Sequence, residues 1–180
     1  MPKPRVIATK RIYEGRVINL RVDTVEEKGK HLERAIVEHR GAVVIVPLDA
    51  KGRVLMVRQY RHAAGRALLE LPAGGLDHGE KPRATAQREL QEEIGYKAAK
   101  LNRIIGFFTV PGFCEEYMHL FIAAGLSPSR LQHDDDEDIK VEPVPLAKIP
   151  ALIRTGRIED AKSIVGLLTY LYLLKSRSGT

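Results

Sequence analysis

The sequence predicts an α/β fold, with one globular domain and a small β-rich segment in front of it. Residues 5–46 are rich in β-branched side chains, which favour strands, whereas residues 82–94 have the apolar spacing of an amphipathic helix. The chain of 180 residues is 44% hydrophobic and 29% charged, which is enough for a sizeable core. We therefore expect strands and helices to share one core.

The first strands are expected in the leading segment and directly after it. The letters KGKH at residues 28–31 indicate a turn within the segment. Residues 42–48 form a wholly apolar strand, residues 49–52 a turn with Asp and Gly at favoured positions, and residues 53–61 a returning strand. We expect the last two strands to pair as a hairpin through the core.

The middle of the chain predicts a helix followed by two strands. Pro82 suits a first helical turn, and Gly95 stands where a glycine commonly follows a helix, so residues 82–94 are expected to be helical. Strands are expected at residues 101–110 and 117–126, with the loop PGFCEE between them.

Two helices are expected to close the chain. The first is short and ends at Gly156, and the second runs from Asp160 to about Lys175. The apolar run at residues 164–174 is about half of the ~20 residues that a membrane-spanning helix requires, so we expect a buried helix and no membrane association. The N-terminus lacks the apolar stretch of a signal peptide, which disfavours export.

The charge balance indicates anionic partners of small size. A formal net charge of +6 suits phosphate-bearing ligands. The chain has no basic stripe with interleaved aromatic residues and no Trp, so we expect no nucleic-acid partner. Cys114 is the only cysteine, and a chain without a possible internal disulfide suits the reducing cytoplasm. The acidic run at residues 134–138 is interpreted as a solvated loop.

Three carboxylates cluster on the predicted helix. Glu89 and Glu93 are four residues apart and lie within about 40° of each other on a helix, with Glu92 flanking them. Taken alone, the letters RELQEE also fit a solvated acidic face. Like charges at this spacing repel unless a cation neutralises them, and Mg²⁺ or Mn²⁺ prefers such oxygen ligands.

The wider spacing favours the metal interpretation. The stretch GGLDHGEKPRATAQRELQEEIGY, residues 74–96, resembles the Nudix box, although Tyr96 stands where an aliphatic residue is more usual. The match covers each fixed position, namely Gly74, Glu80, Arg88, Glu89, Glu92, Glu93 and Gly95. Such a match arises by chance only about once in 10⁸ to 10⁹ starts, so the chain resembles Nudix hydrolases rather than carrying a random acidic helix.

The resemblance implies a role for each residue of the box. Glu89 and Glu93 are the first-choice ligands of a divalent metal, with Glu92 as a third or shared ligand and the backbone carbonyl of Ala73 completing the site. A second set supports the box structurally, with Glu80 and Arg88 forming a pair that braces the loop against the helix. The supporting residues are Gly74, Glu80, Arg88 and Gly95.

The resemblance also implies an architecture and an assembly. Nudix domains are α/β/α sandwiches around a mixed sheet, which we expect for residues 41–180, and residues 1–40 resemble the antiparallel β segment through which ADP-ribose pyrophosphatases form homodimers. The letters RVLMVRQYRHAAGRALLELPAGG, VPGFCEEYMHLFIAAGL and EDAKSIVGLL look like that branch of the family. Pro111, sixteen residues beyond Gly95, fits the same branch.

The implied activity is metal-dependent hydrolysis of the pyrophosphate bond of ADP-ribose to AMP and ribose 5-phosphate. The alternatives are another nucleoside diphosphate derivative, such as a sugar nucleotide, a dinucleoside polyphosphate or NADH, and a non-catalytic ADP-ribose sensor. Arg58 and Arg61 are candidates for holding the pyrophosphate. Strand alternation puts them on opposite faces, so both cannot easily reach one cleft, and the resemblance places the arginine of the site at Arg61. Tyr13 or Tyr60 could stack on the adenine.

The loop PGFCEE supplies the candidate catalytic base. The resemblance assigns the catalytic base to Glu116, with Glu115 as the alternative. It also counts Glu92 and Glu93 of the metal site among the catalytic residues. Cys114 lacks the supporting motifs of a nucleophile. Three histidines have no metal-ligand spacing and are expected to be turn or surface residues. They are His62, His78 and His119.

Overall fold

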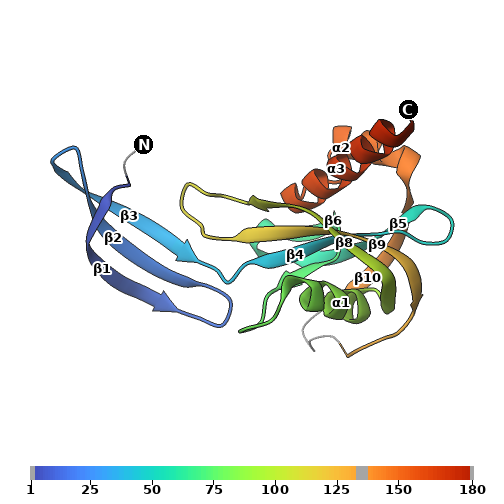
Figure 1. The fold of residues 1–180 in the computed structure, drawn as a ribbon, viewed down its shortest axis with the longest axis horizontal. Coiled ribbons are helices and arrows are strands. Elements are labelled where there is room, and N and C mark those ends of the chain that lie inside the picture. The colour runs from blue at the N-terminus through green and yellow to red at the C-terminus, as the bar shows by residue number, and fades with distance from the viewer. Residues whose placement is uncertain (1–2, 133–137, 179–180) are drawn as a thin grey trace.

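The computed structural model describes residues 3–132 and 138–178, and the acidic run at residues 134–138 lies outside them except for Asp138. Figure 1 shows two parts, a small curved sheet at the N-terminal end and a larger α/β body. The small sheet ends at Glu38 and the first strand of the body begins at Ala42. The division at residue 40 between two domains stays a prediction.

The leading segment folds as an antiparallel sheet, as expected. Its strands are β1 (Arg5–Glu14), β2 (Asn19–Glu27) and β3 (Lys30–Glu38), in the order β1-β2-β3. The turn between β2 and β3 holds Gly29 at φ 72°, a conformation that glycine adopts at little cost. Every residue of β1 is exposed, so this sheet has no core of its own on that edge.

Two further sheets form the body. The first, in the order β7-β4-β9-β8, is mixed because β4 runs parallel to β9 while the other pairs are antiparallel. The second is antiparallel in the order β10-β5-β6. Their bounds are β4 Ala42–Pro47, β5 Arg53–Arg61, β6 Arg66–Glu70, β7 Ala73–Gly75, β8 Tyr96–Phe108, β9 Tyr117–Pro128 and β10 Ile139–Pro145.

The predicted hairpin of β4 and β5 is wrong, although the turn between them is present. The amide of Gly52 donates to the carbonyl of Asp49 at 3.0 Å, which closes the turn. β4 and β5 nevertheless belong to different sheets and share only an isolated bridge between Leu48 and Val54. The reason is that β7 and β9 occupy both edges of β4, so β5 has no free edge there to pair with.

Helices cover both faces of the mixed sheet. The bounds of the helices are α1 Pro82–Glu93, α2 Ile149–Arg154 and α3 Ala161–Ser178, close to those expected. Val43 of β4 packs in one buried cluster with Leu90 of α1, whereas the next residue, Val44, packs in another with Leu167 of α3. Successive side chains of a strand point to opposite faces, so β4 separates two layers. The α/β/α sandwich around a mixed sheet is confirmed.

Three strands were not anticipated, and β10 shows why. Pro143 and Pro145 interrupt its sequence, and proline argues against a central strand because it cannot donate to a ladder. β10 lies at the edge of its sheet, where one side of the strand needs no partner. The short strands β6 and β7 likewise lacked a distinct pattern. In the described residues, no helix is long and apolar enough to cross a membrane.

Candidate active site

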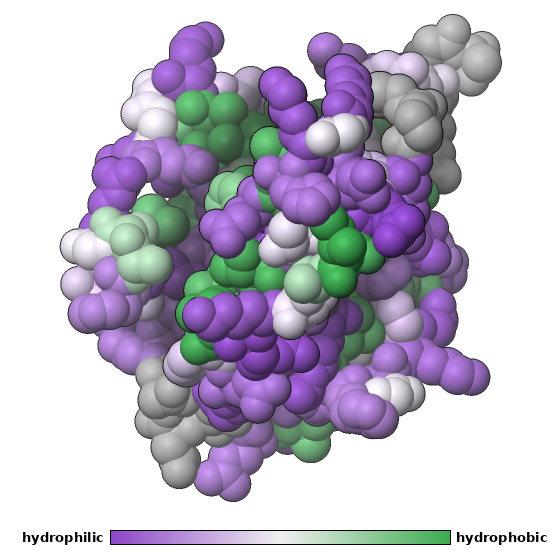
Figure 2. All heavy atoms as spheres, turned by 90° about the vertical axis from the view of Figure 1, so that its left-hand side faces the viewer, coloured by the Kyte–Doolittle hydropathy of each residue, from purple (hydrophilic) through white to green (hydrophobic). Residues whose placement is uncertain are grey.

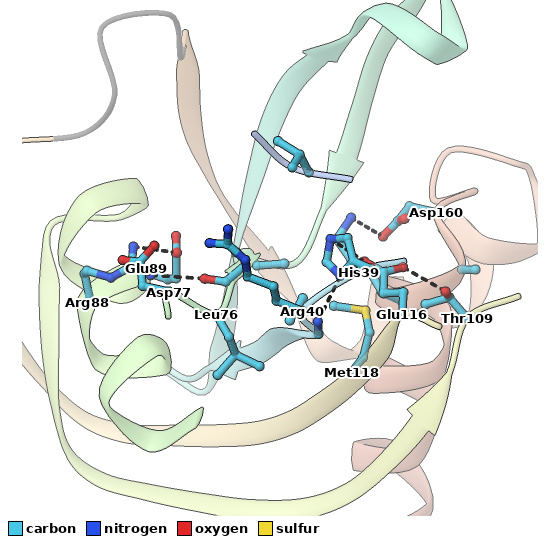
Figure 3. Close-up of a pocket in the computed structure, with 18 of the residues that line it drawn as sticks. His39, Arg40, Leu76, Asp77, Arg88, Glu89, Thr109, Glu116, Met118 and Asp160 are labelled. Carbon is cyan, nitrogen blue, oxygen red and sulfur yellow. Dashed lines mark hydrogen bonds and ion pairs between the residues drawn. The ribbon is translucent and has the colours of Figure 1, made fainter. Parts of the chain in front are cut away.

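A cleft of about 860 Å³ lies where the N-terminal sheet, α1 and α3 meet (Figure 3). Short segments from distant parts of the chain line it: residues 39–42 before and within β4, residues 73–77 from β7 onward, one face of α1, and residues 160–162 at the start of α3. The loop before β9 contributes Glu116. The cleft therefore collects the residues of the box and of the PGFCEE loop.

The carboxylates of α1 lie at different depths. Glu89 is 8% exposed and lines the cleft together with Glu92, whereas Glu93 is 4% exposed. The backbone amide of Ala73 donates to Glu93 Oε2 at 3.1 Å, which joins the helix to β7. A Cβ added at Gly74 would lie 1.9 Å from Glu89 Oε1, so the glycine leaves room for this carboxylate against the backbone.

Arg88 binds the loop of the box and the acidic face of α1 at once. Its Nε and Nη2 donate to the two carboxylate oxygens of Glu80 at 3.3 and 3.1 Å, which is the expected pair. Its Nη1 also donates to Glu89 at 2.7 Å and to Glu92 at 2.8 Å. Burial by itself would lower the pKa of Arg88, but the hydrogen bonds and charges of these glutamates outweigh it and raise the pKa.

The donor set suits a hard divalent cation. Among the described residues, no three His, Cys, Asp or Glu side chains already converge closely enough to enclose a metal. Glu89 and Glu92 nevertheless present carboxylate oxygens to one cleft, with Glu89 packed against the backbone at Gly74, and such oxygens are the ligands of Mg²⁺ and Mn²⁺. A cation binding there would compete with the Arg88 guanidinium for both carboxylates.

Arg61 enters the cleft from the end of β5 and is held by a buried carboxylate. Its Nε and Nη2 donate to Glu70 at 2.9 and 2.7 Å, and Glu70 is only 1% exposed. Lys162 of α3 also donates to Glu70, and it lies 3.0 Å from Asp160. The Glu70 hydrogen bond raises the pKa of Arg61. Two cations are thus fixed at the same rim of the cleft.

The other sequence candidates on β5 and β1 lie elsewhere. Arg58 pairs with Glu142 of β10 at 2.9 Å and is not among the described residues that line the cleft. Arg58 and Arg61 are three residues apart on β5, so strand alternation puts their side chains on opposite faces, as expected. Tyr60 is 60% exposed and Tyr13 is 55% exposed, and neither lines the cleft. The structure therefore brings Arg61 to the box, but not Arg58 or either tyrosine.

The structure separates the two candidate bases. Glu116 lines the cleft, and its Oε2 accepts a hydrogen bond from Thr109 Oγ1 at 2.7 Å (Figure 3). Glu115 turns toward the N-terminal sheet, where it accepts from Arg21 Nη2 at 2.8 Å. His39 lies on the far side of Glu116, with its Nε2 3.8 Å from Oε1. This geometry favours Glu116 over Glu115.

Several residues of the cleft escaped sequence reasoning. His39 and Arg40 occupy the link between β3 and β4, and Figure 3 shows Arg40 between Glu89 and Glu116. The amide of Gly41 donates to His39 Nδ1 at 3.0 Å, so a neutral ring carries its proton on Nε2, toward Glu116. A His-Arg pair directly before a buried strand is the only local signal. Glu70 and Lys162 gave none, because their proximity arises from folding.

The expectation for the histidines is correct for His62 and His78, which are exposed, and wrong for His119. His119 lies on β9, partly buried, with its ring 5.1 Å from that of Tyr117. Its Nδ1 is buried without a hydrogen-bond partner in the described part of the chain. Burial, and then the charge of Arg103, lower the pKa of His119. Its alternation with the buried Met118 and Leu120 on the strand explains this position.

The comparison with known families agrees with the cleft and the fold. The family model described as NUDIX domain matches residues 38–165. The matched region runs from the end of β3 to the first turns of α3 and includes every residue of the box. The chain therefore belongs to the NUDIX family.

Individual relatives narrow the comparison. The chain is 41% identical over 172 residues to an ADP-ribose pyrophosphatase of Bacillus subtilis, covering 94% of this chain and 92% of the relative. It is equally similar, with the same coverage, to a methanol dehydrogenase activator of Bacillus methanolicus. A crystal structure of an ADP compounds hydrolase superposes with a TM-score of 0.86 at 24% identity, covering 98% of this chain and 97% of that one, which supports the fold.

Proposed function

We propose that the protein hydrolyses the pyrophosphate bond of ADP-ribose, giving AMP and ribose 5-phosphate. The observation that carries the proposal is the cleft that Glu89 and Glu92 of the box line together with Arg61 and Glu116. The ADP-ribose pyrophosphatase of Bacillus subtilis, similar over nearly the whole of both chains, supports ADP-ribose as the substrate.

Glu89, Glu92 and Glu93 would hold Mg²⁺ or Mn²⁺, with the backbone carbonyl of Ala73 as a further ligand. When bound, the cation neutralises phosphate charge and lowers the pKa of water. Arg61 fits the planar recognition of phosphate oxygens, because Glu70 already fixes its guanidinium at the rim of the cleft.

Glu116 accepts the proton of the attacking water. The water oxygen forms a bond to one phosphorus while the bond between that phosphorus and the bridging oxygen breaks. The electron pair of the broken bond stays on the bridging oxygen of the departing phosphate. The attacked phosphorus keeps the water oxygen, so the two products are phosphomonoesters that together contain the atoms of one water molecule. Thr109 orients the Glu116 carboxylate for this step through its hydrogen bond to Oε2.

Product analysis of ADP-ribose hydrolysis in ¹⁸O-labelled water, with Mg²⁺ and with excess chelator, tests the proposal. We expect AMP and ribose 5-phosphate in equal amounts, the label in one of them, and no turnover with chelator. A parallel panel contains a sugar nucleotide, a dinucleoside polyphosphate and NADH. Faster turnover of one of these would replace ADP-ribose as the substrate, and activity with chelator would contradict the metal role.

The Bacillus methanolicus relative supports a second candidate function, action on a partner enzyme. A purely regulatory sensor would bind ADP-ribose without hydrolysing it. The complete set of box carboxylates, with Glu89 and Glu92 in the cleft, favours hydrolysis. Calorimetric binding of ADP-ribose with Mg²⁺, but without product formation, would favour the sensor instead.

We also propose a homodimer formed through residues 1–40. β1 is exposed along its whole length, and its apolar side chains Val6, Ile7 and Ile12 are 40–50% exposed. Figure 2 faces the end of the molecule that carries this sheet, where apolar areas lie among hydrophilic side chains. Sedimentation should give twice the 20.1 kDa chain mass, and a 20.1 kDa species at working concentration would contradict the dimer.

A further inference from the structure

The loop that carries Glu116 is bound to the outer edge of the N-terminal sheet. The amide of Val37 donates to the carbonyl of Phe113 at 2.8 Å, and the amide of Glu115 donates to the carbonyl of Val37 at 2.9 Å. β3 is an edge strand of its sheet, so backbone groups that face away from β2 are available to the loop. The loop thus pairs with β3 in the manner of a short additional strand.

A side-chain contact reinforces this backbone pairing. Arg21 of β2 donates from Nη2 to Glu115 Oε1 at 2.8 Å. The same guanidinium is oriented by two carboxylates of its own sheet, since Nη1 donates to Glu38 at 2.5 Å and Nε donates to Asp23 at 3.1 Å. Arg21 therefore presents a fixed donor to the loop.

Glu115 and Glu116 face in opposite directions from adjacent positions in the chain. Glu115 bonds to the N-terminal sheet, whereas Glu116 lies in the cleft, bonded to Thr109 and close to His39. A rotation of the backbone at Glu115 would therefore move the carboxylate of Glu116 as well. The contact with the sheet restrains that rotation.

We propose that Arg21 is a positioning residue, which holds Glu115 so that the neighbouring Glu116 points into the cleft. The inference rests on the proposed role of Glu116 as the base. Neither Arg21 nor Glu115 lines the cleft, so both act through the loop backbone. The N-terminal sheet then has a part in the reaction as well as in assembly.

The positioning role predicts a kinetic effect without a matching loss of stability. The Glu115 side chain is 47% exposed, and ion pairs at such sites add little to stability. A catalytic group displaced by about 1 Å can lose on the order of 10²-fold in rate. Removal of the Glu115 side chain should therefore lower kcat while the thermal midpoint stays nearly constant. Arg21→Ala also removes hydrogen bonds to Asp23 and Glu38, so its thermal midpoint should fall, and its kcat is measured well below that midpoint.

The test compares Glu115→Ala and Arg21→Ala with the controls Glu27→Ala and Arg34→Ala. Glu27 and Arg34 form an ion pair in the same sheet but without contact to the loop, and Glu27 is 40% exposed, close to the 47% of Glu115. Arg34 is 49% exposed and Arg21 21%, so Glu27→Ala is the matched control and Arg34→Ala tests the loss of an arginine from the sheet. The readouts are kcat and KM for ADP-ribose, the thermal midpoint, and hydrogen exchange of residues 109–116. The sheet retains other contacts in Arg21→Ala, because Arg11 still pairs with Glu38 and Thr9 with Asp23.

We expect Glu115→Ala and Arg21→Ala each to lower kcat about tenfold and to change KM by less than about twofold. Both should also speed the hydrogen exchange of residues 109–116. The controls should match the wild type in all of these. Glu115→Gln should recover part of the rate, because its amide oxygen still accepts a hydrogen bond. The double variant Arg21→Ala/Glu115→Ala should lose no more than either single variant, since both remove one contact.

Four outcomes would overturn the inference. The first is wild-type kcat in Glu115→Ala beside an impaired Glu116→Gln, which leaves the proposed function intact. The second is an equal loss in the Glu27→Ala control, which would show a general effect of the sheet. The third is a loss in Glu115→Ala without one in Arg21→Ala, which would make Glu115 itself the base. Wild-type kcat in Glu116→Gln would remove the proposed base and this inference together.

Discussion

At the scale of single residues, the site is arranged by carboxylates that are held in place by cations. Glu70 is buried between Arg61 and Lys162, and Arg88 joins Glu80 to the acidic face of α1. A buried carboxylate that loses its cationic partner costs far more free energy than an exposed one. Each of these side chains is therefore held in the position that keeps its ion pair. The consequence is a cleft whose charged groups are oriented before a ligand arrives.

Glu93→Gln should reduce turnover of ADP-ribose by about 10²-fold or more, because a metal ligand supplies several kcal/mol of charge stabilisation. The amide oxygen can still accept the hydrogen bond from the Ala73 amide, so the fold should persist. Steady-state kinetics and the thermal midpoint check both statements, with the exposed Glu33→Gln as the control. Unchanged turnover would remove Glu93 from the metal site.

Gly74→Ala should lower the free energy of unfolding by about 1–3 kcal/mol, since the new Cβ must displace a buried carboxylate. That Cβ would lie 1.9 Å from Glu89 Oε1, whereas a Cβ at Gly75 would meet no atom within 4 Å. Gly75→Ala is therefore the matched control for stability. Chemical denaturation measures both variants, and equal stabilities would show that Glu89 moves aside without cost.

At the scale of elements, the helix α1 fixes the position of the box between the buried strand β4 and the cleft. α1 packs its apolar side on β4 and presents Glu89 and Glu92 to the cleft. Its end is marked by Gly95, whose φ of 74° suits glycine after a helix. The position of the box carboxylates therefore depends on the packing of Leu90, which is fully buried on the same helix.

Leu90→Ala should destabilise the protein by about 2–5 kcal/mol, because it removes buried methyl groups and leaves a cavity under α1. Leu168→Ala on α3 is the control, since Leu168 is 48% exposed, and it should change stability by less than about 0.5 kcal/mol. Urea denaturation gives both values. A small loss in Leu90→Ala would mean that α1 is held mainly by its polar contacts.

At the scale of the whole molecule, carboxylates in ion pairs make the fold sensitive to acid. Several of them have a pKa below the ordinary value. They are Asp23, Glu38, Asp49, Glu70 and Glu80. Burial by itself would raise the pKa of Glu70, but the hydrogen bonds and charges of Arg61 and Lys162 outweigh it.

A lowered pKa in the folded state means that the unfolded chain binds more protons in the acid range, so stability rises with pH there. For Glu70 the contribution is fully present above its ordinary value of 4.5 and is lost as the pH falls below it. We expect the free energy of unfolding to decrease below pH 4.5, with a shallower decrease in Glu70→Gln. Denaturation at a series of pH values measures this slope, and identical slopes would contradict the role of Glu70.

Patterns that are local in the chain allowed sound predictions. The helix with its glutamates, the two C-terminal helices and the antiparallel leading segment were all expected within a few residues of their observed bounds. The pair of Glu80 and Arg88 followed from the resemblance of the box. Each of these depends on residue spacing within one element or between near neighbours, which the sequence displays directly.

The sequence by itself therefore determined the α/β class, the acidic helix and the identity of the box. Only the tertiary structure decided which strands pair, so that β5 leaves β4 for β10 and β6. It also decided that Arg61 reaches the cleft, that Glu70 lies between Arg61 and Lys162, and that the loop of Glu116 rests on β3. The physical reason is that these contacts join segments far apart in the chain, whose proximity results from packing rather than from local spacing.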